Sequence, residues 1–167
     1  MPEDHPRRKP TLGVLAAFRT EVSTLAGGLA SPNKTRVGGR AAWRGGLGEN
    51  EVLICAGGMG PERSAASARA LVERGVSALL CVGAAGGLDP ALKVGDLLVA
   101  EWVLEAGEGL PPTPCDGAWL ERVRALASRT GVRLVAGGLV SVARPVSTPE
   151  AKARLAEETG ALAVDME

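Results

Sequence analysis

Short apolar runs alternate with segments of helical periodicity along this chain. Residues 11–17, TLGVLAA, form an uninterrupted apolar run, which is typical of a strand covered on both faces. In the next segment Phe18, Val22 and Leu25 recur at helical spacing, and the glycine pair at 27–28 follows them. The pattern therefore predicts a buried strand and then an amphipathic helix that ends near this glycine pair.

The middle of the chain contains the clearest local pattern. Residues 34–48, with glycine pairs on either side of Arg40 to Arg44, predict a hairpin or a short meander. Residues 51–75 then combine an apolar run, a glycine turn and a helix with Pro61 near its first turn, where the missing N–H has no cost. A further apolar run follows within 76–87. Together these segments predict a right-handed βαβ unit.

The last third of the chain continues the alternation. Strands are predicted within 96–104, 132–146 and 161–167, and a proline-rich loop at 108–117. Helices are predicted at 118–131, where Trp119, Val123 and Leu126 share a face and Gly131 is the C-cap, and at 147–160, where Thr148 is the N-cap and Pro149 the first helical residue. The pattern indicates an α/β fold of three layers, α/β/α, around one central, mostly parallel mixed sheet.

Composition narrows the class of protein. The length of 167 residues fits one domain, and the usage of 46% hydrophobic and 23% charged residues argues against disorder and coiled coils. We expect a disordered tail at 1–10 and a single domain at 11–167. Nineteen basic residues balance nineteen acidic ones, so nucleic acid is not expected as a partner. No signal peptide and no spanning segment are visible, so we expect a cytoplasmic protein without stable membrane insertion.

The chain offers few residues for metal or nucleophilic chemistry. The single histidine, His5, lies in the tail, which argues against a Ser-His-Asp triad, a Cys-His pair and a histidine-bound metal. Cys55, Cys81 and Cys115 lie far apart without CxxC spacing, and we interpret them as buried thiols rather than redox or metal ligands. No metal and no cofactor are therefore expected, and the chemistry must rest on carboxylates, backbone dipoles and arginine.

Two glycine loops follow predicted strands. Gly57, Gly58 and Gly60 precede a helix, where free backbone N–H groups can hold an anion, although a tight turn alone would also explain them. Arg63 stands where a dinucleotide-binding loop has its third glycine, which weakens the interpretation as a dinucleotide-dependent oxidoreductase. The second loop, 83–87, ends the next strand. Open α/β sheets bind ligands at these strand ends, so the two loops together favour a site.

Acidic residues stand at the same strand ends. Glu21 lies in the first turns after the first strand, where a solvated helix residue is the simpler interpretation. Asp165 and Glu167 flank Met166 at the end of the last strand, where a frayed chain end is the alternative to a binding role. We predict that these acids and the two glycine loops meet at one edge of the sheet.

The chain resembles the nucleoside phosphorylase and nucleosidase superfamily, which includes purine nucleoside phosphorylase and methylthioadenosine/S-adenosylhomocysteine nucleosidase. The matching segments are GVLAAFRTEV, GGMGPERSAASARALVERG, VGAAGGLDPALKVGDLLVA and AVDME, in the order of the family, and the likeness extends from Leu12 to Glu167. Within the superfamily the chain is most similar to the hopanoid-associated phosphorylases, which are assigned to adenosylhopane cleavage. The resemblance implies a phosphorylase/hydrolase-like fold and cleavage of the N-glycosidic bond of a purine nucleoside.

The resemblance also implies roles for individual residues. Glu21 corresponds to the acidic residue that positions the nucleophile, which makes it the catalytic residue of the set. The other residues fall into three groups, which are the ribose contacts Met59, Met166 and Glu167, the water or phosphate pocket Ala84, Ala85 and Gly86, and the base contacts Arg144, Pro145, Val146 and Asp165. A nucleoside with water or phosphate would be the small-molecule partner. Carboxylates suit this chemistry because positive charge develops on the ribose as the bond breaks.

Three departures from the family pattern shape the expectation. The aspartate that protonates the purine lies beyond the position of Glu167, so the domain is expected to be incomplete at its C-terminus and this chain to be slow or inactive. Cys81 and Ala84 replace the arginine and the hydroxyl of phosphorolytic relatives, so hydrolysis is favoured unless Arg63 or Arg19 holds phosphate. No aromatic residue stands near Arg144 to stack on the base.

The resulting hypothesis is an enzyme that hydrolyses adenosylhopane or a related adenosine derivative and releases adenine. The alternative is a non-catalytic nucleoside-binding or interaction module left by truncation of such an enzyme. Relatives assemble as dimers or hexamers, and an unfinished sheet edge favours association, so a homo-oligomer is expected.

Overall fold

The computed structural model describes residues 11–107 and 109–167 of the chain. The described residues form two compact units, one that ends at Gly83 and one that begins at Ala84, and each is described by itself. The expected tail at 1–10, with His5, lies outside the described residues. The expectation that 11–167 is a single domain stays a prediction. No helix in the described ranges is both long and apolar enough to cross a membrane.

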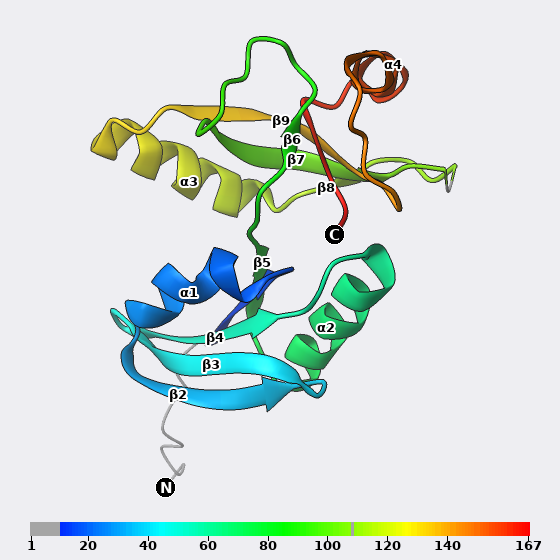
Figure 1. Cartoon of the computed structure of the whole chain (residues 1–167). Helices are drawn as coiled ribbons and strands as arrows, with labels where there is room; N and C mark the ends of the chain where they lie inside the picture. The colour runs from blue at the N-terminus through cyan, green and yellow to red at the C-terminus, as the bar shows by residue number, and fades with distance from the viewer. Residues whose placement is uncertain (1–10, 108) are drawn as a thin grey trace, which may run out of the picture. The chain divides into compact units, whose positions relative to one another are not determined.

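The first unit is built on a mixed five-stranded sheet (Figure 1). Its strands are β1 (Thr11–Ala16), β2 (Ala30–Val37), β3 (Arg40–Leu47), β4 (Asn50–Ala56) and β5 (Ala78–Cys81), in the spatial order β2-β3-β4-β1-β5. β1 is parallel to both β4 and β5, whereas β2, β3 and β4 pair in antiparallel fashion. The predicted meander is confirmed, and so is the βαβ pattern, because β4 and β5, joined by the helix at 61–73, are both parallel to β1. The right-handed crossover stays a prediction. The turn between β2 and β3 uses Gly38 and Gly39, both with positive φ.

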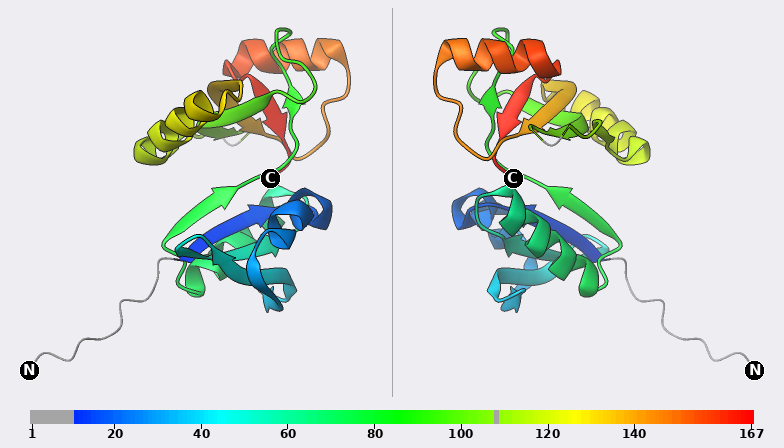
Figure 2. Two further views of the ribbon diagram at one scale, coloured as in Figure 1. Left: turned by 90° about the vertical axis from the view of Figure 1, so that its left-hand side faces the viewer. Right: turned by 90° about the vertical axis from the view of Figure 1, so that its right-hand side faces the viewer.

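Two helices cover the two faces of this sheet. α1 (Arg19–Gly27) and α2 (Pro61–Glu73) come into the foreground in the two opposite views of Figure 2. The core residues alternate accordingly along the strands, since neighbouring strand residues point to opposite faces. The α1 side contains Val14, Ala16, Val52 and Ile54 with Val22, and the α2 side contains Leu15, Leu53 and Cys55 with Leu71. The first unit therefore has three layers.

The second unit has its own mixed sheet in the order β6-β10-β9-β7-β8. Its strands are β6 (Gly86–Gly87), β7 (Leu97–Glu105), β8 (Thr113–Pro114), β9 (Leu134–Ser141) and β10 (Ala163–Asp165). α3 (Gly117–Thr130) and α4 (Pro149–Thr159) lie on opposite sides of this sheet (Figures 1 and 2). The buried residues Leu88, Val140, Ala161 and Val164 form the core, and Leu155 of α4 packs against it.

The helix ends of the second unit agree with the sequence. The Thr148 hydroxyl accepts a hydrogen bond from the backbone N–H of Ala151 at 3.2 Å, which caps α4 ahead of Pro149. Gly131 ends α3 in the left-handed conformation, as its C-cap position requires. Neither α3 nor α4 contains a fully buried residue. The predicted apolar face of α3 is therefore only partly covered, and Trp119 and Leu126 are exposed.

The α/β fold with helices on both sides of mixed sheets is confirmed, with one difference in how the strands pair. The backbone ladders divide the strands into two five-stranded sheets, in which β5 and β6 are edge strands, instead of one central sheet. Hydrophobic patterns predict which segments are strands but carry little information about their partners, so the sequence could not assign this division.

Two side-chain expectations are wrong. Phe18 does not belong to the apolar stripe of α1, because its extended backbone places it at the N-cap, with 50% of its surface exposed. Cys81 is exposed, because it lies on the edge strand β5, and Cys115 is only partly buried, whereas Cys55 on the inner strand β4 is fully buried. An apolar run therefore predicted the strand but not its position in the sheet.

Close packing between β7 and β9 gives a testable consequence. Gly138 of β9 stands opposite Trp102 of β7, and a Cβ atom at Gly138 would overlap the indole ring. We expect Gly138→Ala to lower the free energy of unfolding by about 1 to 3 kcal/mol, since the ring or the strand must move. Urea unfolding of the natural protein and of the Gly138→Ala variant measures the difference in unfolding free energy. Gly117→Ala, where a Cβ meets nothing within 4 Å, is the control and should change stability far less.

Candidate active site

Glu21 is held at the N-terminus of α1. Its Oε2 accepts a hydrogen bond from the backbone N–H of Phe18 at 2.8 Å, which satisfies one of the N–H groups that the helix leaves unpaired. This is half of a capping box, because Phe18 has no side-chain acceptor to complete it. The carboxylate lies at the N-terminal end of the helix, beside backbone N–H groups that the helix leaves unpaired. The first turn of α1 therefore holds the carboxylate in a defined position.

The same carboxylate faces the glycine that follows β5. Glu21 Oε1 lies 3.2 Å from the position that a Cβ atom on Gly83 would take. A larger residue at 83 would press against the carboxylate, so glycine keeps this approach open. The predicted convergence of Glu21 with the end of the neighbouring parallel strand is found within the first unit.

The first glycine loop ends β4 in the same unit. The N–H of Gly57 donates to the carbonyl of Ala16 at 2.7 Å, which ties the loop to the end of β1. A Cβ on Gly57 would lie 2.7 Å from Leu15 Cδ1, so this glycine permits close packing. Met59 follows at the tip of the loop with 43% of its surface exposed, and can therefore contact a ligand.

The second unit brings the other glycine loop beside the terminal motif. β6 pairs with β10 so that Gly86 stands opposite Val164, and Asp165 follows directly. The segment 84–86, predicted to hold water or phosphate, therefore adjoins β10, which ends at Asp165 and is followed by Met166 and Glu167. The sequence placed both at strand ends, and within this unit the structure brings them together.

The surroundings of Asp165 in the second unit change the pKa of its carboxyl. Burial raises the pKa of its carboxyl, while hydrogen bonds from the Ser141 hydroxyl and the backbone N–H of Glu167 lower it. Ser141 comes from the end of the neighbouring strand β9, and the carbonyl of Asp165 accepts from the N–H of Val142 at 3.0 Å. These contacts fix the direction of the carboxylate.

Asp165 should make stability depend on pH in a defined direction. Because its folded-state pKa lies above the ordinary value of 3.8, the unfolded chain ionises first as the pH rises. The carboxyl therefore costs the folded state nothing below pH 3.8, and destabilises it progressively as the pH rises through the folded-state pKa. Urea unfolding between pH 3.5 and 7, in steps of about half a unit, should show Asp165→Asn gaining stability relative to the natural protein over this window. A stability difference that does not change with pH would contradict the assignment.

Three of the four predicted base contacts, Arg144 to Val146, lie in the loop between β9 and α4, and the fourth, Asp165, ends β10. Arg144 and Pro145 are exposed, whereas Val146 is partly buried and packs against the core of the second unit. Val146 thus has a structural role in addition to the proposed one. Glu21 and Met59 belong to the first unit, and the remaining predicted residues belong to the second. That both sets serve one ligand stays a prediction.

Two residues escaped the sequence reasoning. Ser141 was not singled out because a serine inside a strand run has no distinctive pattern, yet it donates to Asp165. Lys152 of α4 places its ammonium 3.7 Å from the Cβ position of Gly86, next to the predicted phosphate or water pocket. Lys152 lies four residues after the N-cap of α4, but this position points to Gly86 only once the pairing of β6 with β10 is known. Among the described residues no group of three His, Cys, Asp or Glu side chains could hold a metal ion.

Comparison with known proteins identifies the family. The model of the phosphorylase superfamily matches residues 11–167, which is the whole of the chain beyond its first ten residues. The chain belongs to the phosphorylase superfamily. The match covers every residue assigned to the site, from Glu21 to Glu167.

Relatives within the phosphorylase superfamily include two nucleosidases. The 5'-methylthioadenosine/S-adenosylhomocysteine nucleosidase of Mycobacterium bovis is 34% identical over 101 residues, which cover 60% of this chain and 40% of that protein. The enzyme of the same name from Staphylococcus haemolyticus is 31% identical over 94 residues, which cover 56% of this chain and 41% of that protein. The matched region thus spans about two fifths of the length of these curated relatives.

Solved structures of the superfamily share the fold. The Helicobacter pylori 5'-methylthioadenosine/S-adenosylhomocysteine nucleosidase with butyl-thio-DADMe-Immucillin-A superposes with a TM-score of 0.89 at 24% identity, over 96% of this chain and 76% of that one. The Streptococcus pyogenes S-adenosylhomocysteine nucleosidase with 5-methylthiotubericidin superposes with a TM-score of 0.89 at 21% identity, over 98% of this chain and 76% of that one. At this identity the likeness establishes the fold.

Proposed function

We propose that this protein cleaves the N-glycosidic bond of a purine nucleoside of the adenosine type and releases adenine. Membership of the phosphorylase superfamily supports this, as do relatives named as nucleosidases. The observation that carries the proposal is the position of Glu21, a carboxylate held by the first turn of α1 and directed at the glycine after β5. A carboxylate in that position can orient a nucleophile and accept its proton.

The proposed step is a hydrolysis at C1' of the ribose. The bond from C1' to N9 breaks, a bond from C1' to a water oxygen forms, and Glu21 takes the proton of that water. The departing purine takes one proton from the solvent, to which Glu21 afterwards returns its own. Positive charge develops on the ribose in between, which favours carboxylates near the sugar. Glu167 and Met166 are assigned to the ribose, Met59 to its flank, and Asp165 with Arg144 to Val146 to the base.

Hydrolysis is proposed over phosphorolysis because of two residues near the second glycine loop. Cys81 and Ala84 stand where phosphorolytic relatives are expected to have an arginine and a hydroxyl, so phosphate has fewer partners. Lys152 is a cation that would favour phosphate, since its ammonium lies next to Gly86. The products therefore have to be measured in the presence and in the absence of phosphate.

The proposed substrates are adenosine derivatives substituted at the 5' position, with adenosylhopane as the first choice. The hopanoid assignment rests on the likeness of segments 56–72, 84–101 and 142–167 to hopanoid-associated phosphorylases. The nucleosidases among the relatives are named for 5'-methylthioadenosine and S-adenosylhomocysteine, which share the adenosine part. A homo-oligomeric, cytoplasmic enzyme remains the expectation.

A base-release assay tests the proposal. The protein is incubated with adenosine, 5'-methylthioadenosine and a synthetic adenosylhopane analogue, and free adenine is measured by chromatography. We expect adenine with free ribose derivatives when phosphate is absent, and no ribose 1-phosphate when it is present. If ribose 1-phosphate were the main product, the reaction would be phosphorolysis and the proposed hydrolysis would be wrong. A folded protein that binds these nucleosides but releases no adenine from any of them would favour the non-catalytic binding module.

A further inference from the structure

A pocket of about 550 Å³ in the first unit has no role in the proposed reaction. It is lined by Ala17, Phe18, Arg19, Thr20, Gly39, Arg40, Ala41, Ala56 and Gly58. Its volume lies within the range of about 300 to 1,000 Å³ that is usual for small-molecule sites. Two of its nine lining residues are arginines and none is acidic, so the pocket carries positive charge. We call it the Arg19–Arg40 pocket.

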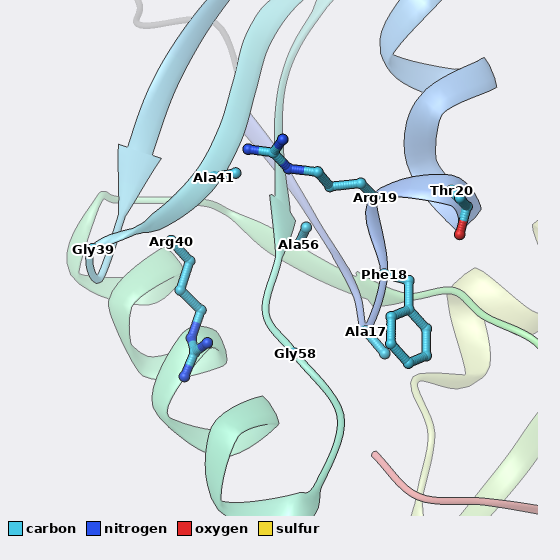
Figure 3. A pocket seen from close by; sticks show the side chains of 9 residues that line it. All are labelled: Ala17, Phe18, Arg19, Thr20, Gly39, Arg40, Ala41, Ala56 and Gly58. Atoms are coloured by element: carbon cyan, nitrogen blue, oxygen red, sulfur yellow. The ribbon is translucent and has the colours of Figure 1, made fainter.

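The two arginines reach the pocket from different elements (Figure 3). Arg19 is the first residue of α1, and its guanidinium extends towards β3, where it lies 5.8 Å from the centre of the Trp43 ring. Arg40 is the first residue of β3, and its guanidinium extends towards the loop before α2. The contact with Trp43 restrains Arg19 and leaves its N–H groups available to a ligand.

Arg40 is packed against the first glycine loop. Its Nη1 lies 3.1 Å from the Cβ position of Gly58, and Cδ of Arg63 lies 3.4 Å from the same position. Two arginine side chains therefore run over one glycine, and a larger residue at 58 would displace them. Gly58 has a φ of +89°, which glycine adopts readily and other residues do not.

The two arginines of the pocket form no direct ion pair within the described part of the chain, although the Glu21 carboxylate lies close by, on the backbone N–H of the lining residue Phe18. Neither Arg19 nor Arg40 forms an ion pair there within 4.0 Å, and the arginines that do so are Arg44, Arg124 and Arg133. A bound oxyanion would supply the opposite charge that neither guanidinium has in a direct ion pair. The planar fork of a guanidinium matches the two oxygens of a carboxylate or phosphate.

Phe18 connects this pocket to the proposed nucleophile-positioning acid. Its backbone N–H holds the Glu21 carboxylate at 2.8 Å, while the residue itself lines the pocket with a half-exposed ring. An apolar flank next to two cations suits a ligand that has an oxyanion on a larger apolar body.

We propose that the Arg19–Arg40 pocket binds an oxyanion, namely the phosphate or carboxylate group of a substituted adenosine. This identification of the ligand rests on the proposed function, whereas the anion site itself does not. Free inorganic phosphate has the same chemistry and is the second source of the oxyanion. The proposal predicts selectivity for adenosine derivatives that are negatively charged away from the glycosidic bond.

Binding measurements distinguish these sources. Calorimetric titrations at low ionic strength use adenosine, adenosine 5'-monophosphate and inorganic phosphate as probes. We expect the monophosphate to bind about tenfold or more tightly than adenosine. In each of the variants Arg40→Gln and Arg19→Gln, the affinities for the monophosphate and for adenosine should differ by no more than about twofold. In the natural protein, rising salt should reduce the preference for the monophosphate. Arg69→Gln, which changes an exposed arginine of α2 outside the pocket, should leave the ratio unchanged.

A further variant and a folding control keep the test decisive even if one of the glutamine variants is unstable. Arg40→Lys keeps the charge but not the fork and should retain part of the preference, and far-UV circular dichroism confirms the fold of each variant. Phosphate that binds alone, competes with the monophosphate and is lost in Arg40→Gln supports the pocket with the free ion as its source. Equal affinity for adenosine and its monophosphate, with phosphate binding unchanged in the double variant Arg19→Gln/Arg40→Gln, overturns the proposal. These titrations need no base release, so failure of the proposed function in the adenine assay is a separate result.

Discussion

Glu21→Gln is expected to lower kcat/KM for adenine release by about 10²-fold or more, because general acid–base catalysis typically contributes about 10² to 10⁴. The amide oxygen of glutamine can still accept the hydrogen bond from the N–H of Phe18, so the first turn of α1 should remain formed. What is lost is the charge that orients water and takes its proton. Steady-state kinetics of adenine release, together with circular dichroism of the variant, measure the two effects separately.

Glu62→Gln provides the matched control for this variant. Glu62 is an exposed acid in the first turn of α2, so its replacement removes the same charge from a helix N-terminus outside the proposed site. We expect its kcat/KM to stay within about twofold of that of the natural protein, since surface substitutions have small effects. If Glu21→Gln also retained activity within about threefold, Glu21 would not position the nucleophile.

Ile54→Ala is expected to cost about 2 to 5 kcal/mol of unfolding free energy, the largest effect on stability among the changes considered. Ile54 is fully buried on β4, which lies between β3 and β1, and stands beside Trp43 and Val14. Removing three carbons there leaves a cavity that the paired strands on both sides cannot readily fill. Urea unfolding followed by tryptophan fluorescence gives the difference.

Leu47→Ala is the control for the cavity. It also removes three carbons from a strand residue, but Leu47 lies at the end of β3 with 44% of its surface exposed. Its cost should remain within about 0.5 kcal/mol. Similar losses for the two variants would show that packing at Ile54 is looser than the structure indicates.

Local chemistry made several elements predictable. Thr148 and Pro149 mark the start of α4, and Gly131 the end of α3, because capping groups and positive φ restrict which residues fit there. The βαβ unit was predictable for a related reason, since an apolar run, a glycine turn and Pro61 follow one another closely. These features depend on neighbours in the sequence.

What the sequence could not provide depends on distant partners. Phe18 and Cys81 are apolar in type, but a cap position and an edge strand leave them exposed. The pairing of β6 with β10, which brings Gly86 next to Val164, has no local pattern at two residues of strand length. The contacts of Ser141, Lys152 and Arg40 follow from such pairings, which is why reasoning from the sequence did not find them.

The sparse covering of α3 and α4 has a consequence for how the protein opens. Helices without a fully buried residue gain little from tertiary packing, which supplies most helical stability in proteins. Their amide protons should exchange with deuterated water through local opening, at a lower free energy than those of the inner strands β1 and β4. Each of the two helices would then open and close separately while the sheet of the first unit remains protected.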